Sequence, residues 1–203
     1  MSSASKDLYG WIIHPTHVQK GENTTTKIAL ISVLTALCLA LQLAPRPPNV
    51  EFTSLLTFVV GAVFGSFMGV SFGCFIMFVN GFLSPWGFAG LNMPFQMVGM
   101  GLVGLVGGLY RGYMHDRSRF VSFMEVAVLG AFLTVVYDLI TNFGVAILPM
   151  ISGVPPTLAL LTVLASGAPF SLVHVCSNTL AFGLIFIPLA RTLSQIPVVK
   201  KFG

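Results

Sequence analysis

The chain has 203 residues, of which 55% are apolar and only 8% are Asp, Glu, Lys or Arg; its mean hydropathy is +0.91. Water-soluble domains carry about 25% charged residues, so this composition excludes a soluble domain. The formal net charge is +4, but the basic residues are scattered over short polar segments, which argues against a surface that binds nucleic acid. The three cysteines are an odd number without CxxC spacing, so the sequence predicts neither a disulfide framework nor a zinc site.

A polar segment, residues 1–26, precedes the apolar part of the chain, and its length and mixed charge distinguish it from the n-region of a signal peptide. Six apolar segments follow: 27–44, 52–66, 68–83, 93–110, 121–148 and 168–190. Prolines or charges separate most of them, as in the stretches 44–49, 84–87 and 111–119. We predict an all-α integral membrane protein with a cytoplasmic segment over 1–26, a six-transmembrane-helix bundle over 27–190 and a cytoplasmic tail over 191–203.

The stretch 52–83 contains no charge or proline after Glu51, so it could form one long kinked helix or two short spans that meet near Gly65. Two spans of about 15 residues would each reach roughly 22 Å, short of the ~30 Å hydrocarbon layer. The basic residues decide between the two. Five spans would leave three basic residues inside and seven outside, whereas six spans with both termini in the cytoplasm leave only Arg46 outside. The positive-inside rule therefore favours six. The nine basic residues then on the cytoplasmic side are Lys6, Lys20, Lys27, Arg111, Arg117, Arg119, Arg191, Lys200 and Lys201.

Residues 157–166 are apolar but too short to span a membrane. We predict that they form an external or re-entrant helix that covers the outer face. The stretch 167–169 would join it to the last span, because Pro169 suits the start of a helix.

Small residues recur every four positions in three stripes within the apolar segments. On a helix, such residues share one face and let two backbones approach closely in lipid. For the glycines we predict packing inside the bundle. For the stripe in 27–44, packing and docking on another membrane protein both remain open. The glycine stripes are Gly61, Gly65, Gly69, Gly73 and Gly104, Gly108; the third stripe is Ser32, Ala36, Ala40, Ala44.

Polar side chains within the apolar segments converge on the outer half of the predicted bundle. Asp138 and Asn178 lie about 15 Å below the outer ends of their spans, and Asn142 and His174 about 9 Å below. Each span presents its two residues on one face. Nearer the outer surface lie Glu51, Asn80, Trp86, Asn92 and Gln96. The ring of Tyr137, next to Asp138, adds aromatic surface. This arrangement predicts an outward-facing binding pocket; as an alternative, the four deeper residues bond one another and join the helices.

Motifs for catalysis are missing from the sequence. It contains no Walker A, GxSxG or HExxH motif, and no span carries two carboxylates close enough to act as a pair. A rhomboid-type dyad needs a serine in a Gly-x-Ser-x loop, whereas Ser171 lies three residues from His174 on one predicted helix. An enzyme that used His174 with Asp138 would lack a nucleophile. His174 has no second His or Cys at ligand spacing. We predict a protein that is not an enzyme and that holds no cofactor or metal.

Several stretches, taken in order, resemble the substrate-binding S components of energy-coupling factor (ECF) vitamin transporters. The resemblance covers about 27–190 and includes the six-span layout with a long polar N-terminus. It is carried by 50–55 (VEFTSL), the glycine run of 61–73, 80–87 (NGFLSPWG), 92–97 (NMPFQM) with 101–108 (GLVGLVGG), Tyr137-Asp138 with Thr141-Asn142, and Pro169-Phe170 with His174 and Ser177-Asn178.

The resemblance implies a plasma-membrane protein that captures a vitamin or related micronutrient outside the cell. Its partners would be a membrane-embedded T component and two cytoplasmic ABC ATPases, and the S component is thought to topple in the membrane to release its cargo. Ala36 and Ala40 match the family's docking motif, and Arg46, Asn49 and Glu51 fall in or beside the loop that serves as a lid. The substrate-binding residues would be Asp138, Asn142, His174, Asn178, Gln96, Asn80, Trp86, Asn92 and Tyr137.

The sequence restricts the ligand only by its chemistry. One Asp, one His, several amides and few aromatic rings suit a polar, largely neutral molecule. Among the ligands of the family, which include riboflavin, thiamin, biotin, folate, cobalamin and queuosine precursors, we favour cobalamin or another large cofactor precursor. The main alternative from another class is a structural membrane subunit with no small-molecule site.

Overall fold

The structure, a computed structural model, describes residues 24–117 and 123–196. Residues 1–23 of the predicted cytoplasmic segment, most of the C-terminal tail and Arg119 lie outside the described residues, whereas residues 24–26 begin the first described helix. Within them the chain forms α-helices, one 3-10 helix and no strand, which confirms the all-α class. The elements are α2 (Thr24–Leu43), α3 (Thr53–Phe64), α4 (Ser66–Leu83), η1 (Gly90–Asn92), α5 (Met93–Arg117), α6 (Phe123–Ile151) and α7 (Pro156–Gln195).

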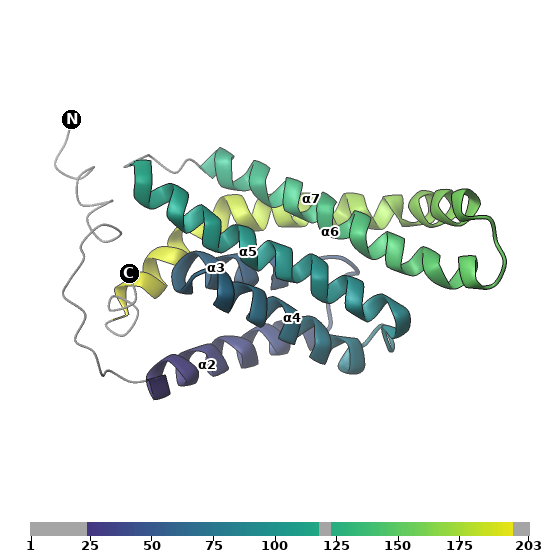
Figure 1. The fold of residues 1–203 in the computed structure, drawn as a ribbon. Coiled ribbons are helices and arrows are strands. Elements are labelled where there is room, and N and C mark those ends of the chain that lie inside the picture. The colour runs from purple at the N-terminus through teal and green to yellow at the C-terminus, as the bar shows by residue number, and fades with distance from the viewer. Residues whose placement is uncertain (1–23, 118–122, 197–203) are drawn as a thin grey trace.

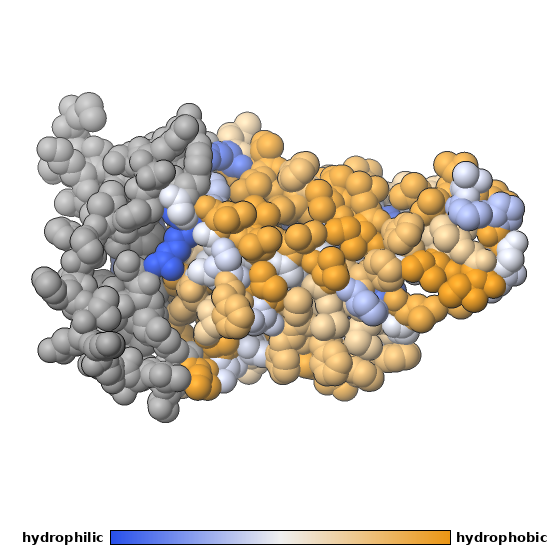
Figure 2. Space-filling model, viewed as in Figure 1, coloured by the Kyte–Doolittle hydropathy of each residue, from blue (hydrophilic) through white to orange (hydrophobic). Residues whose placement is uncertain are grey.

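The helices pack side by side in one bundle, in which the start of α2 and the end of α7 lie at the same end (Figure 1). Of the described helices, α4, α5 with η1, α6 and α7 are long and apolar enough to cross a membrane, whereas α2 and α3 are apolar but shorter over the searched range. Much of the visible side surface is apolar (Figure 2), as expected for a surface in contact with lipid.

The division of 52–83 into two helices is as predicted, and the break falls at Gly65. This residue has φ +96°, a conformation that side chains disfavour, and its N–H bonds to the carbonyl of Gly61 to end α3. The 12 residues of α3 reach only about 18 Å. Almost every residue of α3 is buried among its neighbours, so this short helix is a central element of the bundle.

The glycine stripes pack inside the bundle, as predicted. A methyl group added to Gly104 of α5 would overlap the backbone of Gly69 in α4, and one added to Gly61 of α3 would overlap the carbonyl oxygen of Gly104. A methyl group on Gly108 would overlap Ser66 at the start of α4. The three helices α3, α4 and α5 therefore meet backbone to backbone at these positions.

The prediction of a separate external or re-entrant helix over 157–166 is wrong. The helix α7 begins at Pro156 and continues for 40 residues through Gly167 and Pro169. Nothing in 157–166 breaks a helix, and Pro169 removes only one backbone hydrogen bond of α7. Since α6 likewise continues through Pro149 to Ile151, the two helices form a hairpin that projects beyond the rest of the bundle (Figure 1).

Candidate ligand-binding pocket

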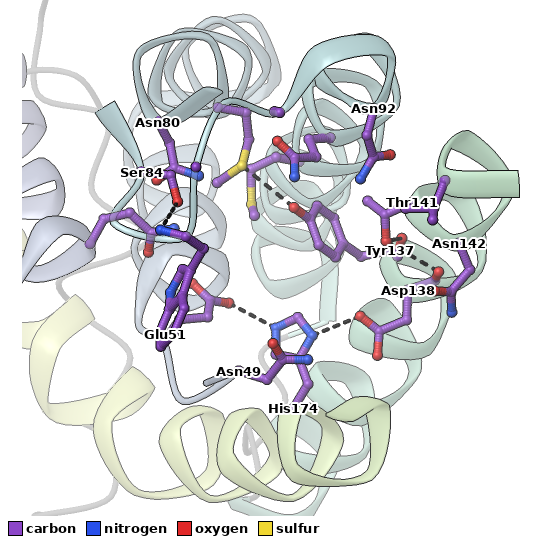
Figure 3. A pocket seen from close by; sticks show the side chains of 18 of the residues that line it. Asn49, Glu51, Asn80, Ser84, Asn92, Tyr137, Asp138, Thr141, Asn142 and His174 are labelled. Atoms are coloured by element: carbon purple, nitrogen blue, oxygen red, sulfur yellow. Dashed lines mark hydrogen bonds and ion pairs between the residues drawn. The ribbon is translucent and has the colours of Figure 1, made fainter. Parts of the chain in front are cut away.

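A pocket with a volume of about 390 Å³ lies near the end of the bundle from which the α6–α7 hairpin projects. Five parts of the chain line it: the end of α2 with the α2–α3 loop, the end of α4 with the loop that follows, the start of α5, the middle of α6 and the middle of α7 (Figure 3). The lining residues are Gln42, Arg46, Asn49, Glu51, Met77, Asn80, Ser84, Trp86, Gly87, Phe88, Ala89, Asn92, Gln96, Met100, Tyr137, Asp138, Thr141, Asn142, Val145 and His174.

A buried cluster of ionisable groups forms one wall. The imidazole of His174 on α7 lies between two carboxylates: Nδ1 is 2.7 Å from Oδ1 of Asp138 on α6, and Nε2 is 3.2 Å from Oε1 of Glu51 (Figure 3). All three residues are at most 8% exposed. The amide of Asn178, one turn further along α7, donates a hydrogen bond of 3.2 Å to the same oxygen of Glu51.

Glu51 is fixed by the start of α3. Its carboxylate accepts hydrogen bonds from the backbone N–H groups of Thr53 and Ser54, and the hydroxyl of Ser54 donates to it at 2.6 Å. The first N–H groups of a helix have no partner within the helix and carry a partial positive charge, so a carboxylate is stabilised there. The sequence Glu-Phe-Thr-Ser therefore begins α3 and at the same time holds one member of the pocket cluster.

Both contacts of His174 can be hydrogen bonds only if the cluster holds a proton beyond the one on a neutral imidazole. A neutral imidazole has a single N–H, yet both ring nitrogens of His174 lie within hydrogen-bond distance of a carboxylate oxygen. Either the ring is protonated or one of the carboxyls is. In both cases the group of Glu51, Asp138 and His174 carries a net charge of −1.

Four acceptor atoms in the pocket wall are buried and make no hydrogen bond to the described residues. They are Oδ1 of Asn80, Oδ1 of Asn92, Oε1 of Gln96 and Oδ2 of Asp138. Buried polar groups in proteins nearly always have a partner. The two ends of an amide can exchange places, but the two oxygens of a carboxylate are equivalent, so Asp138 lacks one partner in either orientation. The wall is thus suited to a molecule that brings hydrogen-bond donors.

The α2–α3 loop is tied down beside the pocket. The guanidinium of Arg46 donates to the backbone carbonyls of Val50 at 2.7 Å and Gln42 at 3.2 Å. Asn49 adopts a positive φ of 61°, and its carbonyl accepts a hydrogen bond of 3.1 Å from the hydroxyl of Ser177 on α7. The loop therefore has a defined conformation at the pocket wall; its role as a lid stays a prediction.

The structure brings nearly all the sequence-predicted binding residues to this one pocket. Asn178 differs, because it is fully buried behind Glu51 and does not line the cavity. Glu51, expected with the lid, belongs instead to the buried cluster. The alternative, in which the four deeper residues bond one another and join the helices, holds in part, because Asp138 on α6 and His174 on α7 lie within hydrogen-bond distance of each other.

Sequence reasoning missed other lining residues: Gln42, Ser84, Phe88, Thr141 and the apolar or small residues Met77, Gly87, Ala89, Met100 and Val145. Gln42 had a signal, since it is an amide within the first apolar segment. Thr141 directly precedes Asn142 but bonds the backbone carbonyls of its own helix. The apolar residues carried no signal, because nothing distinguishes them from the rest of the bundle.

Ala36 and Ala40 lie on the exposed face of α2, away from the pocket. The opposite face of the same helix buries Leu34, Cys38 and Gln42. The small-residue stripe of α2 therefore packs against no other described helix.

The bundle combines several helices that are long and apolar enough to cross a membrane with a polar pocket, as expected of a membrane protein that binds a small molecule. The family model described as ECF-type riboflavin transporter, S component, matches residues 22–195, which is most of the chain. The chain belongs to this family, and the resemblance found in the sequence is confirmed. No curated protein and no solved structure matches the chain.

Proposed function

We propose that the protein is the substrate-capture subunit of an ECF-type importer. It would bind a vitamin or related micronutrient from outside the cell and deliver it through a T component powered by two ATPases. The family match over 22–195 is the observation that carries this proposal. The pocket supports it, because a cavity of about 390 Å³ falls within the ~300–1,000 Å³ usual for small-molecule sites. A scaffold subunit would have no use for buried acceptors without partners.

The proposed topology has six membrane-spanning helices with both termini in the cytoplasm of the plasma membrane. Arg111 on α5 lies close to Gly65, at the junction of α3 and α4, and Arg191 lies in the last turns of α7. Both are at the opposite end of the bundle from Arg46 and the pocket. Basic residues mark the cytoplasmic side, so this distribution supports a pocket that opens to the outside. The 12-residue helix α3 would reach only part of the way through the hydrocarbon layer.

Riboflavin is the first ligand to test, since the matching family is named for its transport. It combines a flat aromatic ring system, whose edge has amide-type donors and acceptors, with a chain of hydroxyl groups. Trp86, Phe88 and Tyr137 supply aromatic surface in the pocket, and the amides of Asn80, Asn92 and Gln96 supply polar partners. A corrinoid is several times larger than such a molecule and exceeds the cavity, so we no longer favour cobalamin.

Native mass spectrometry of the protein purified from cells grown in rich medium tests the proposed function. We expect one bound micronutrient per chain, and added riboflavin should lose its fluorescence on binding to the emptied protein. A different vitamin at full occupancy would keep the capture function and replace riboflavin. A protein that carries no ligand, and in which Asp138→Ala or Asn178→Ala lowers only the stability, would support the scaffold alternative.

A further inference from the structure

The two carboxylate oxygens of Asp138 have different surroundings. Oδ1 lies 2.7 Å from Nδ1 of His174. Oδ2 is buried and makes no hydrogen bond to any described residue. Asp138 as a whole is 8% exposed and lines the pocket, where its carboxylate faces the cavity beside Tyr137 and Asn142 (Figure 3). A rotation of the carboxylate would exchange its oxygens but would still leave one of them without a partner.

The partners of Asp138 are themselves held in place. His174 is fixed at its other nitrogen by Glu51, and Glu51 is fixed by Asn178 and by the start of α3. A continuous chain of hydrogen bonds thus runs from the N-terminus of α3 through Glu51 and His174 to Oδ1 of Asp138. The other oxygen, Oδ2, is left buried and without a partner in the wall of the pocket. Such a chain orients a binding group before the ligand arrives, which reduces the entropy lost on binding.

Three donors of the pocket lining are engaged elsewhere. The hydroxyl of Thr141 donates to the backbone carbonyls of Tyr137 and Asp138. The hydroxyl of Tyr137 contacts Sδ of Met77, and the guanidinium of Arg46 donates to backbone carbonyls of the α2–α3 loop. The partner of Oδ2 is therefore to be sought in the bound molecule.

We propose that Asp138 determines specificity by accepting, at Oδ2, a hydrogen bond from an N–H or O–H group of the ligand. The inference rests on the proposed function. It adds which atom of the protein contacts the ligand and that this atom selects for a ligand with a hydrogen-bond donor. In riboflavin, two kinds of group could donate: the imide N–H of the ring and the hydroxyls of the ribityl chain. A site built around a buried polar group strongly rejects an analogue that leaves this group unpaired.

Binding of three flavins to the wild-type protein and to Asp138→Asn tests the proposal. The flavins are riboflavin, 3-methylriboflavin, which lacks the imide N–H, and lumiflavin, which lacks the ribityl hydroxyls. Asn keeps the size of Asp and an acceptor for His174, but it places an NH₂ group where Oδ2 was. The control is Glu125→Gln, the same acid-to-amide change on α6, outside the pocket lining.

We expect Asp138→Asn to raise the Kd for riboflavin more than tenfold and Glu125→Gln to change it less than twofold. For one of the two analogues, the Kd of the wild-type protein should be more than tenfold higher than for riboflavin. For that same analogue, Asp138→Asn should raise the Kd little further. This non-additivity shows that the changed groups contact each other, and the analogue concerned identifies the donor.

Two results would overturn the inference while leaving the capture function intact. One is an Asp138→Asn protein that binds riboflavin within twofold of the wild type. The other is wild-type protein that binds both analogues within threefold of riboflavin, a result that decides the matter even if Asp138→Asn fails to fold. Wild-type protein that binds no riboflavin would refute riboflavin as the ligand, and with it this inference. That failure is distinguishable because it precedes any substitution.

Discussion

Replacing Gly104 by Ala tests the close packing of α5 against α4. An added methyl group would overlap the carbonyl of Gly69 and would lie 2.8 Å from the backbone nitrogen of Val70. These are backbone atoms, so no rotamer change relieves the overlap, and the helices must separate by roughly 1 Å to restore ordinary contact distances near 3.5 Å. Overpacking of this kind costs about 1–3 kcal/mol. We expect the upper part of that range, because the gap weakens contacts along the whole interface.

The matched control is Gly112→Ala in the same helix. An added methyl group there meets no atom within 4 Å, and Ala favours a helix over Gly by up to about 1 kcal/mol. Thermal unfolding of both variants in detergent measures the difference. At about 2–4 °C per kcal/mol for a domain of this size, Gly104→Ala should lower Tm by roughly 5–10 °C, while Gly112→Ala should leave it unchanged or slightly higher. Equal shifts in the two variants would refute the packing argument.

Three further predictions concern the pocket and the exposed face of α2. Asn142→Ala and His174→Ala should each weaken ligand binding, measured by fluorescence titration, in protein that still unfolds cooperatively; normal binding by both would mean that the site lies elsewhere. Ser177→Ala removes the 3.1 Å hydrogen bond from α7 to the α2–α3 loop, so stopped-flow measurements should show ligand dissociation several-fold faster with association little changed. Ala36→Trp combined with Ala40→Trp should abolish uptake by cells and leave ligand binding by the purified protein intact; lost binding would show that this face supports the pocket.

The helices and their packing were largely predictable because the signals are local. Prolines and charges mark most helix ends, and the four-residue repeat of Gly61, Gly65 and Gly69 indicated a close helix contact before any coordinates. The division of 52–83 into two spans followed from the distribution of basic residues between the two sides of the membrane. Hydropathy alone did not indicate it. The extent of α7 was mispredicted because Pro169 suits the start of a helix, whereas α7 continues through this residue. A helix of 40 residues is about 60 Å long, twice the thickness of the hydrocarbon layer.

The candidate site was predictable where it lies on regular helices. Counting the rise per residue gave the Asp138/Asn142 pair and the His174/Asn178 pair the same two depths, with His174 level with Asn142. The structure brings His174 within 2.7 Å of Asp138, one turn deeper. The role of Glu51 was not predictable in this way. Its position depends on a loop in which Asn49 has a positive φ and on hydrogen bonds to the first N–H groups of α3. Helical periodicity does not describe either feature, so the sequence placed Glu51 near the site but not within the cluster.

The helix α2 joins the pocket to the proposed docking face. Its buried side ends in Gln42, which lines the pocket and accepts a hydrogen bond of 2.7 Å from the hydroxyl of Thr53 at the start of α3. Its exposed side carries Ala36 and Ala40, within two turns of Gln42. A single helix with no internal break therefore contacts the ligand site on one side and would contact a partner on the other. A change in the position of α2 on ligand binding would reach the partner directly, without passing through the glycine-packed helices α3, α4 and α5.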